Sequence, residues 1–254
     1  MITINDVEFF YPNFKIVCPN LEISEGEVVA VTGNNGSGKT TFLKLISGHI
    51  KPKRGKILFN GSTKDKSDIR VGVVFQNPDN QIIFNNVYDD ICFTLKNFKI
   101  SKEEFNARVD EALGVVKMSE FKNSETMNLS TGQKQRIVIA NMLAISPKVL
   151  LLDEVTAYLD AETKLIIYNL LGELKKRGVT VIFCTNQLDE IVFADRVLVF
   201  DKGNMVADKS RDDALADLSI FGAAELPLKL RILNKIKGNA RFDGELFDLI
   251  KDKL

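Results

Sequence analysis

The stretch from Gly33 to Thr40 constrains the fold of this chain more than any other. Its sequence, GNNGSGKT, matches the phosphate-binding loop pattern G-x-x-x-x-G-K-[ST] at every fixed position. The apolar run Val28–Val31 before it predicts a buried strand, and Thr41–Ile46 after it has helical spacing. This context favours a nucleotide site over a glycine-rich turn that matches by chance, because the loop must join a strand to a helix.

The residues of this loop have separate roles in holding a nucleotide. The glycines allow successive backbone N–H groups to point at phosphate oxygens, and the helix N-terminus adds partial positive charge. Lys39 is expected to reach the β- and γ-phosphates, and the Thr40 hydroxyl is expected to bind Mg²⁺. The predicted nucleotide-binding residues of the loop are Gly33, Asn34, Asn35, Gly36, Ser37, Gly38, Lys39, Thr40 and Thr41.

Composition indicates an ordinary globular chain. Its 254 residues with 45% hydrophobic content predict one large α/β domain, with or without an appendage. Lys+Arg and Asp+Glu are equal at 34 each, so no overall field favours nucleic acid, and we expect no nucleic-acid partner. Cys18, Cys92 and Cys184 form no C-x-x-C pair, which indicates a reducing compartment. No apolar run is long enough for a membrane span, and the N-terminus opens as a strand, so the sequence predicts a cytosolic protein.

The first residues predict an antiparallel β-layer. Ile2–Phe10 alternates apolar and polar side chains, and a second strand pattern, Phe14–Ile23, follows a turn at Pro12-Asn13. Tyr11 lies at the edge of this layer. Its ring could stack on a purine base, or it could be a core residue beside the turn, and the local sequence leaves both open.

A helical region separates the remaining strands. Lys56–Asn60 and Arg70–Phe75 read as strands, and turn residues follow from Gln76 to Asn80. The predicted helices are Val87–Phe98, then Lys102–Lys117 with Ser101 as N-cap and Glu104 three residues on, then Thr131–Ile145. The sequence therefore predicts a helical subdomain inserted at about residues 78–146.

The last part returns to α/β patterning. The run Val149–Leu152, the amphipathic stretch Ala161–Lys176 and the run Val179–Cys184 predict a strand–helix–strand unit with buried parallel strands. Strands at Arg196–Asp201 and Met205–Ala207 complete the sheet, and short helical stretches follow from Asp212. We therefore expect one domain over residues 1–207 and a C-terminal helical region over 208–254.

Two adjacent carboxylates follow a buried strand. Asp153 and Glu154 end the run that starts at Val149, so they lie at the strand tip where open α/β sheets bind ligands. Asp153 can hold Mg²⁺, and Glu154 can polarise the attacking water as a general base. A helix-capping acidic pair is the alternative, which the phosphate-binding loop disfavours.

The segment Asn128–Arg136, NLSTGQKQR, resembles the L-S-G-G-Q signature of ATP-binding cassette (ABC) ATPases. Other motifs occur in the order of that family, so the resemblance covers nearly the whole chain. Tyr11 falls at its adenine-stacking aromatic, Gln76 at its Q-loop glutamine, Val149–Glu154 at its Walker B strand, and Leu159-Asp160 at its D-loop. The signature lies at the start of the predicted helix Thr131–Ile145, and the backbone N–H groups at a helix N-terminus bind anions.

The resemblance implies a P-loop NTPase fold of the ABC type, with an antiparallel β-layer, the inserted helical subdomain and the C-terminal helical appendage. It implies ATP hydrolysis with Mg²⁺ and a head-to-tail dimer, in which the signature of one subunit covers the γ-phosphate held by the other. The residues that it implies are catalytic Glu154, Gln76 and Asn186; base-stacking Tyr11; signature Ser130, Thr131, Gly132 and Gln133; D-loop Asp160; and metal-binding Thr40, Gln76 and Asp153.

Within that family, Phe75–Gln81 and Val87–Phe93 resemble the energy-coupling factor (ECF) ATPases of vitamin and transition-metal-ion importers. This resemblance implies a transmembrane coupling subunit that docks beside Gln76 and a separate membrane protein that binds the substrate. It also implies that the C-terminal region helps to hold two ATPases together. The expected location is the cytoplasmic face of the membrane, reached through these partners.

Two positions depart from the family pattern. Thr131 replaces a signature glycine, and Asn186 stands where the switch histidine is usual. Both positions belong to sites that two subunits of a dimer share, and a homodimer would carry both departures in each site. We therefore expect a heterodimer with a second, related ATPase subunit. A partly degenerate subunit that binds ATP for assembly or regulation, and a soluble ABC ATPase outside transport, are the alternatives.

Overall fold

The computed structural model describes residues 1–63 and 68–221. Within these residues eleven strands form one sheet in the order β6-β5-β1-β2-β11-β10-β4-β9-β8-β7, and β3 pairs with β1 beside this path. The strands are β1 (Ile2–Tyr11), β2 (Phe14–Cys18), β3 (Leu21–Ile23), β4 (Val28–Thr32), β5 (Arg54–Phe59), β6 (Ser62–Thr63), β7 (Val71–Val74), β8 (Val149–Asp153), β9 (Thr180–Thr185), β10 (Arg196–Asp201) and β11 (Asn204–Ser210).

The centre of the sheet is parallel. Strands β10, β4, β9, β8 and β7 pair in parallel with continuous register, for example Val31 with Cys184 and Leu152 with Phe183. Every residue of β4, β8 and β9 is buried, as expected for parallel strands covered on both faces. Their carboxyl ends therefore meet at one edge, where the phosphate-binding loop and the acidic pair begin.

The first residues form the predicted antiparallel layer, with one correction. The single strand expected over Phe14–Ile23 is two strands, β2 and β3, which pair with opposite halves of β1. Pro19 lies between them, and a proline has no N–H to donate to a strand ladder. Strand β5 covers the other edge of β1, so the layer holds more strands than the opening residues alone predicted.

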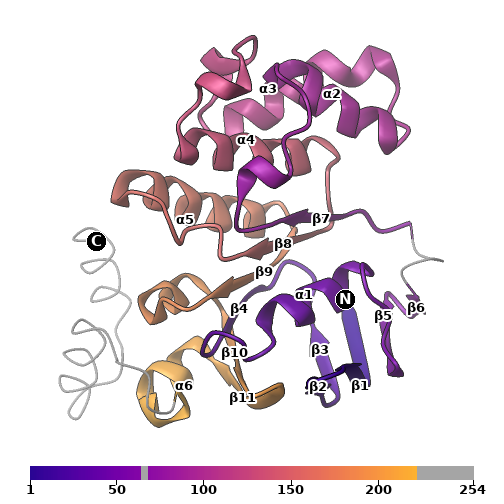
Figure 1. The fold of residues 1–254 in the computed structure, drawn as a ribbon, viewed down its shortest axis with the longest axis vertical. Helices are drawn as coiled ribbons and strands as arrows, with labels where there is room; N and C mark the ends of the chain where they lie inside the picture. Colours follow the sequence, from indigo (N-terminus) through magenta and orange to yellow (C-terminus); the bar gives the residue numbers. More distant parts are fainter. Residues whose placement is uncertain (64–67, 222–254) are drawn as a thin grey trace.

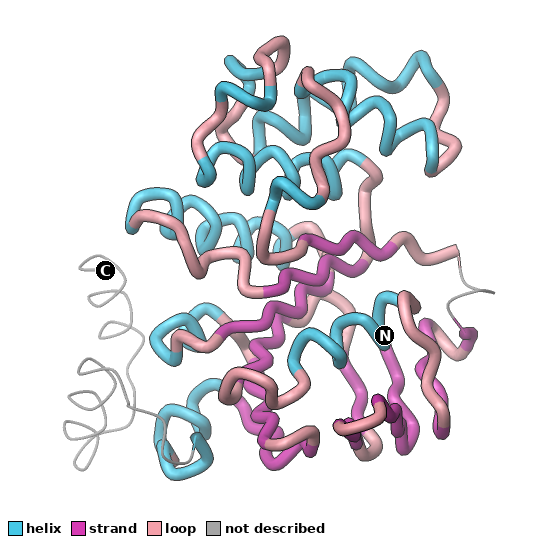
Figure 2. The backbone as a smooth tube through the Cα atoms, in the orientation of Figure 1, coloured by secondary structure: helices cyan, strands magenta, loops and turns pink. Residues whose placement is uncertain are grey.

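Helices cover both faces of the sheet (Figures 1 and 2). The α-helices are α1 (Lys39–Ser47), α2 (Val87–Asn97), α3 (Phe105–Val115), α4 (Thr131–Ala144), α5 (Ala161–Lys176) and α6 (Arg211–Ala216). The 3₁₀ turns are η2 (Pro78–Asn80), η3 (Lys102–Glu104), η4 (Ser119–Phe121), η5 (Thr126–Asn128), η6 (Leu188–Phe193) and η7 (Leu218–Phe221). One apolar core lies between the sheet and α1, and a second lies against α2 to α5. The α/β class and the antiparallel layer predicted from the sequence are confirmed.

The chain between β7 and β8 is helical. Figure 1 shows α2, α3 and α4 packed together beyond the β7 edge of the sheet. Ser101 stands at an N-cap position as expected, but of the 3₁₀ turn η3 that precedes α3, and its side chain makes no capping bond and contacts Glu103 instead. A capping box forms at Ser130, where Gln133 is the third helical residue.

The predicted C-terminal region lies largely outside the described residues. Helix α6 and turn η7 are described, and residues 222–254 are not, so the dimerisation role expected for 208–254 stays a prediction, as do the domain limits. In the described part of the chain no helix is long and apolar enough to cross a membrane.

Candidate nucleotide site

The loop between β4 and α1 has a backbone that requires glycine at two positions. Gly33 has a φ of 141°, and a Cβ there would lie 2.0 Å from the Phe200 carbonyl oxygen. Gly38, the N-cap of α1, has a φ of 113°, and its Cβ would lie 3.2 Å from the Phe14 ring. The first turn of α1 therefore has no side-chain cap, and its N–H groups remain available to an anion.

Lys39 is held in an extended position within this loop. Its side chain is buried, and Nζ donates to the carbonyl oxygens of Gly33 (2.8 Å) and Asn34 (3.3 Å). Nζ also lies 3.4 Å from Glu154 Oε1. A buried ammonium needs such partners, and a phosphate would replace a carboxylate contact of this kind.

Thr40 and Asp153 meet at the carboxyl edge of the sheet. Thr40 Oγ1 donates to Asp153 Oδ1 at 3.1 Å. Burial raises the pKa of Asp153 above its ordinary value; the hydrogen bond from Thr40 opposes this rise, and the charge of Glu154 adds to it. Hydroxyl and carboxylate oxygens are ligands that Mg²⁺ prefers, usually together with phosphate. Ser37 Oγ, also in the loop, is buried without a partner among the described residues, so this donor set fits Mg²⁺ with a phosphate.

Glu154 adopts a backbone conformation that is rare for its residue type. Its φ is 49°, in the left-handed region, and its N–H donates to the Cys184 carbonyl at 3.1 Å. Strain of this kind persists only where the surroundings enforce it, and it is frequent at active sites. Gln76 Nε2 donates to Glu154 Oε2 at 3.2 Å. The structure thus brings two of the three predicted catalytic residues, Gln76 and Glu154, into contact, although 78 positions separate them.

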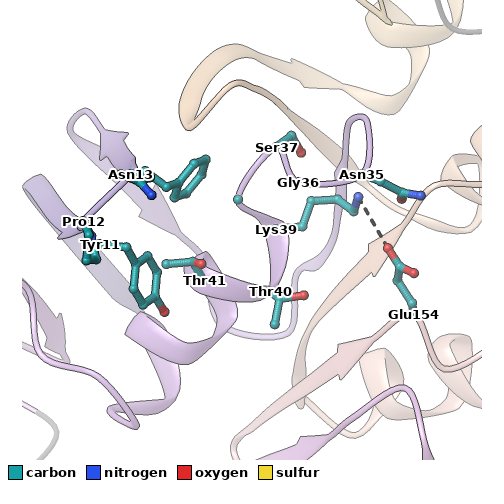
Figure 3. A pocket seen from close by; sticks show the side chains of 12 residues that line it. Tyr11, Pro12, Asn13, Asn35, Gly36, Ser37, Lys39, Thr40, Thr41 and Glu154 are labelled. Atoms are coloured by element: carbon teal, nitrogen blue, oxygen red, sulfur yellow. Dashed lines mark ion pairs between the residues drawn. The ribbon is translucent and has the colours of Figure 1, made fainter.

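A pocket of about 540 Å³ lies over the loop. Figure 3 shows Tyr11 on one side of it and Glu154 on the other, with Lys39 directed at Glu154. The Tyr11 ring contacts Phe9 edge-on at 4.9 Å and is 41% exposed, so it is not a core residue. The lining residues are Tyr11, Pro12, Asn13, Phe14, Asn35, Gly36, Ser37, Gly38, Lys39, Thr40, Thr41 and Glu154.

Asn186 lies in a second cavity of about 410 Å³ on the other side of the loop. Gly33 and Asn34 line this cavity with it, and Asn35 lines both cavities. The Asn186 side chain is exposed, and it follows directly after β9. Asn186 therefore stands beside the phosphate-binding loop but outside the pocket that Tyr11 and Glu154 share.

The structure does not bring the signature residues to either cavity. Ser130 Oγ accepts the N–H of Gln133 at 3.2 Å, and Gln133 Oε1 accepts the N–H of Ser130 at 2.8 Å. Helix geometry leaves the N–H groups of Thr131 and Gly132 without intrahelical acceptors, and both residues are at least partly exposed. This helix end therefore lines neither of the two cavities beside the phosphate-binding loop.

Asp160 caps the next helix. Its carboxylate accepts the Thr163 N–H (2.8 Å) and the Thr163 hydroxyl (2.9 Å), and these hydrogen bonds lower the pKa of Asp160. A Cβ on Gly132 would lie 3.2 Å from Thr163 Oγ1, so the signature helix α4 approaches α5 closely here.

Sequence reasoning missed several contributors to this site. Phe14 and Asn13 line the pocket although they were read only as strand and turn residues. Gly203 N–H donates to the Ser37 carbonyl at 2.9 Å, so the β10–β11 turn supports the loop. Glu190 forms a buried hydrogen bond to Thr156, as described below. These contacts join residues far apart in the chain, and no local pattern indicates them.

Comparison with known proteins identifies the family of this chain. The family model described as "ABC transporter" matches residues 18–157. A curated "Energy-coupling factor transporter ATP-binding protein EcfA1" from Mycoplasmopsis synoviae is 38% identical over 94% of each chain. Its counterpart of the same name in Mycoplasmoides gallisepticum is also 38% identical, over 98% of this chain and 95% of that protein.

Two solved structures have the same fold. The structure of cbiO1 from Clostridium perfringens, described as part of the ABC transporter complex cbiONQ, has a TM-score of 0.79 and 31% identity over 98% of both chains. A dimer of the ATP-binding cassette MJ0796 bound to ADP and Pi has a TM-score of 0.72 and 29% identity, over 83% of this chain and 99% of that one. The chain described here belongs to the ABC transporter family, as an ATPase that resembles the ATP-binding subunits of energy-coupling factor transporters.

Proposed function

We propose that this chain is the ATP-binding and ATP-hydrolysing subunit of an ECF importer for vitamins or transition-metal ions. Residues 1–207 would form the nucleotide-binding domain, with a helical subdomain at about 78–146, and 208–254 the dimerisation region. The names of the relatives support the transporter class. The observation that carries the proposal is that Gln76 donates a hydrogen bond to Glu154 and opens the segment that leads to an exposed apolar loop.

In the proposed reaction the pocket holds ATP with its base against Tyr11 and its phosphates in the loop. Lys39 exchanges its contact with Glu154 for the β- and γ-phosphate oxygens, which leaves Glu154 able to accept a proton from water. The water oxygen bonds to the γ-phosphorus as the bond to the β,γ-bridging oxygen breaks, and ADP leaves with that electron pair. Thr40 and Asp153, with Gln76, would hold Mg²⁺, which neutralises charge on the phosphate oxygens.

The signature helix is proposed to act on a nucleotide held by another chain. Its open N–H groups at Thr131 and Gly132 suit an anion, and they lie away from the pocket of their own chain. A head-to-tail dimer would bring each such end onto the γ-phosphate of the partner, with Asp160 at the same interface. ATP would then hold the dimer together, and hydrolysis would release it.

The exposed loop after Gln76 supports docking of a transmembrane coupling subunit. Ile83 and Phe84 are 66% and 39% exposed, and adjacent exposed apolar side chains of this kind suit a protein interface. The buried carboxylate of Asp90 accepts both of their backbone N–H groups, at 2.8 and 3.0 Å, and also the Asn141 amide on α4 at 2.8 Å. The apolar patch of Ile83 and Phe84 is thus connected through Asp90 to the signature helix, and it lies in the same loop segment as Gln76, which donates to Glu154.

Charge placed on this patch tests the proposal. Ile83→Asp should abolish co-purification of this chain with a transmembrane subunit from its own membranes and stop substrate uptake, with ATP binding to the isolated chain unchanged. Val206→Asp is the matched control, because Val206 is 56% exposed on β11, far along the sheet from β7. Equal retention of membrane partners in both variants would contradict the docking site.

Asn186 favours a second candidate, a subunit that binds ATP normally but hydrolyses it slowly. An amide donates a hydrogen bond, but it is shorter than imidazole and cannot become cationic, so it stabilises the developing phosphoryl charge less well. Most turnover would then occur at the site of a second, related ATPase. Asn186→His should raise the single-turnover rate in a complex whose partner site is disabled. An unchanged or lower rate would exclude this asymmetry.

The two departures from the family pattern, Asn186 and Thr131, also support a heterodimer, which would lie at the cytoplasmic face of the membrane. A homodimer would place Asn186 and Thr131 in both composite sites, whereas a heterodimer separates them and pairs each with residues of another chain. Native mass spectrometry of the complex from its own membranes should find one copy of this chain, a second ATPase, a transmembrane subunit and a substrate-binding membrane protein. Two copies of this chain without a second ATPase would contradict it.

A further inference from the structure

A buried carboxylate lies behind the candidate site without a role in the reaction proposed above. Glu190, on turn η6, is 2% exposed, and its Oε1 accepts two hydroxyl hydrogen bonds. One comes from Thr156 at 2.7 Å and the other from Tyr168 of α5, also at 2.7 Å. A carboxylate is costly to bury, and apolar residues of similar size would fill such a space at lower cost.

The three groups connect three separate segments of the site. Thr156 stands two residues after Glu154, and the turn between them is closed by the Ala157 N–H donating to the Glu154 carbonyl at 3.1 Å. Glu190 itself is tied to the switch turn, because its N–H donates to the Gln187 carbonyl at 3.0 Å. The proposed base and the turn that carries Asn186 are therefore joined through one side chain.

Helix α5 fixes this connection from a third side. Lys164 Nζ donates to Gln187 Oε1 at 2.6 Å, and Tyr168, one turn further, donates to Glu190. The Tyr168 ring stacks on Phe193 at 4.1 Å, which orients its hydroxyl. Burial, and then the charge of Glu190, raise the pKa of Tyr168 well above its usual value, so the hydroxyl remains a proton donor at physiological pH.

We infer that Glu190 is a positioning residue for ATP hydrolysis: by binding Thr156 and Tyr168 it holds the Asn186 turn at a fixed distance from Glu154. The inference rests on the proposed function, in which Glu154 is the base and Asn186 contacts the transferred phosphate. Because α5 begins at its cap Asp160, the same contacts tie the D-loop to the switch turn. Movement of the D-loop at a dimer interface would then be transmitted to Asn186 through α5.

Substitutions at Glu190 separate positioning from packing. Glu190→Leu keeps the volume but leaves the buried Thr156 hydroxyl and the partly buried Tyr168 hydroxyl without an acceptor, whereas Glu190→Gln keeps the oxygen that accepts both. In the assembled complex with the partner site disabled, we expect Glu190→Leu to lower the single-turnover rate about 10-fold, less than the loss of a transition-state donor outright. The affinity for a non-hydrolysable ATP analogue should change by less than about two-fold, as for a group that acts only in the transition state. Glu190→Gln should restore most of the rate, and Glu173→Leu, at an exposed carboxylate of α5, should have no effect.

A double-mutant cycle with Asn186→Ala makes the test specific. If Glu190 acts by placing Asn186, Glu190→Leu should lower the rate by less than about two-fold once Asn186 is already replaced. If the rate losses of Glu190→Leu and Asn186→Ala simply multiply in the double variant, the inference is wrong. It is also wrong if Glu190→Gln lowers the rate as much as Glu190→Leu, or if the rate falls in proportion to nucleotide affinity. If Glu190→Leu does not fold, Tyr168→Phe provides the same cycle, because it removes one donor and keeps the ring stacking.

Glu154→Gln, measured beside these variants, distinguishes the two levels of the proposal. Loss of hydrolysis in Glu154→Gln with a wild-type rate in Glu190→Leu overturns only the positioning role. A wild-type rate in Glu154→Gln overturns the proposed function itself, because the base assignment on which the positioning role depends is then wrong.

Discussion

Two helix N-termini suit phosphate in this molecule, and they differ in how their N–H groups are satisfied. Helix α1 begins at Gly38 without a side-chain cap, beside the buried Lys39. Helix α4 begins at an exposed capping box, in which Ser130 and Gln133 already use two of the available N–H donors. The α1 end thus combines open N–H groups with a cation of its own chain, whereas we propose that the α4 end serves a ligand held by another chain.

The largest effect is expected at the α1 end. Among the described residues that line the pocket, Lys39 is the only cation. Its hydrogen bonds to charged phosphate oxygens are each expected to contribute about 1.5–3 kcal/mol. Lys39→Ala should therefore lower ATP affinity or turnover on the order of 10²-fold, since 1.4 kcal/mol is a factor of ten. Isothermal titration calorimetry with ATP and Mg²⁺ measures the affinity, and the rate of phosphate release measures the turnover.

Lys56→Ala is the control for the loss of positive charge, because Lys56 is exposed on β5 and lines no part of this pocket. If both variants bind and hydrolyse ATP like the unmodified chain, Lys39 is not a phosphate ligand and the contrast between the two helix ends disappears.

An intermediate effect is expected at the α4 end. Ser130→Ala removes the oxygen that caps Gln133, which should destabilise the chain by about 1 kcal/mol. It should leave ATP binding to the pocket of this chain unchanged and slow hydrolysis at the partner's site by about 10-fold, because one hydrogen bond to a charged oxygen is lost while the N–H groups of Thr131 and Gly132 remain. Thermal unfolding of the isolated chain and single-turnover hydrolysis in the complex measure these effects.

Ser101→Ala is the matched control, since Ser101 occupies an N-cap position but makes no capping hydrogen bond. Weaker nucleotide binding by the isolated Ser130→Ala chain would show that α4 serves its own pocket, contrary to this account.

The smallest effect concerns Asp153, beside the α1 end. Its pKa is raised in the folded chain, mainly by burial, so the folded state binds more protons than the unfolded state between the ordinary and the raised pKa. The free energy of unfolding therefore falls as pH rises through that window, and the ionised carboxylate is destabilising at neutral pH. In EDTA, Asp153→Asn should raise the unfolding temperature at pH 7, and the difference should vanish below about pH 3.9.

When Mg²⁺ and ATP are added, the unmodified chain should have a higher unfolding temperature than Asp153→Asn, the reverse of the order in EDTA. Ligand that binds only the folded state stabilises it, and the variant lacks the carboxylate expected to hold the metal. A variant that is less stable than the unmodified chain in EDTA at pH 7 would contradict the cost assigned to the buried charge.

The sequence predicted the α1 end better than its surroundings, for a physical reason. The loop, its strand and its helix are contiguous, and the bounds of α5 also follow from neighbouring residues, with Asp160 as N-cap and Gly178 after the end. The split of Phe14–Ile23, the left-handed Glu154 and the Glu190 contacts depend on pairing between distant segments. Intrinsic patterns do not report such pairing, because tertiary packing decides it.

Photo-crosslinking can show whether helix α4 contacts ATP that is bound by a different chain. An ATP analogue with a photoreactive group on the γ-phosphate would be bound to the assembled complex and activated, and the labelled peptides identified. We expect labelling at residues 130–133 of this chain, undiminished when Lys39→Ala disables its own pocket. Labelling that disappears in Lys39→Ala would show instead that α4 contacts the nucleotide of its own chain.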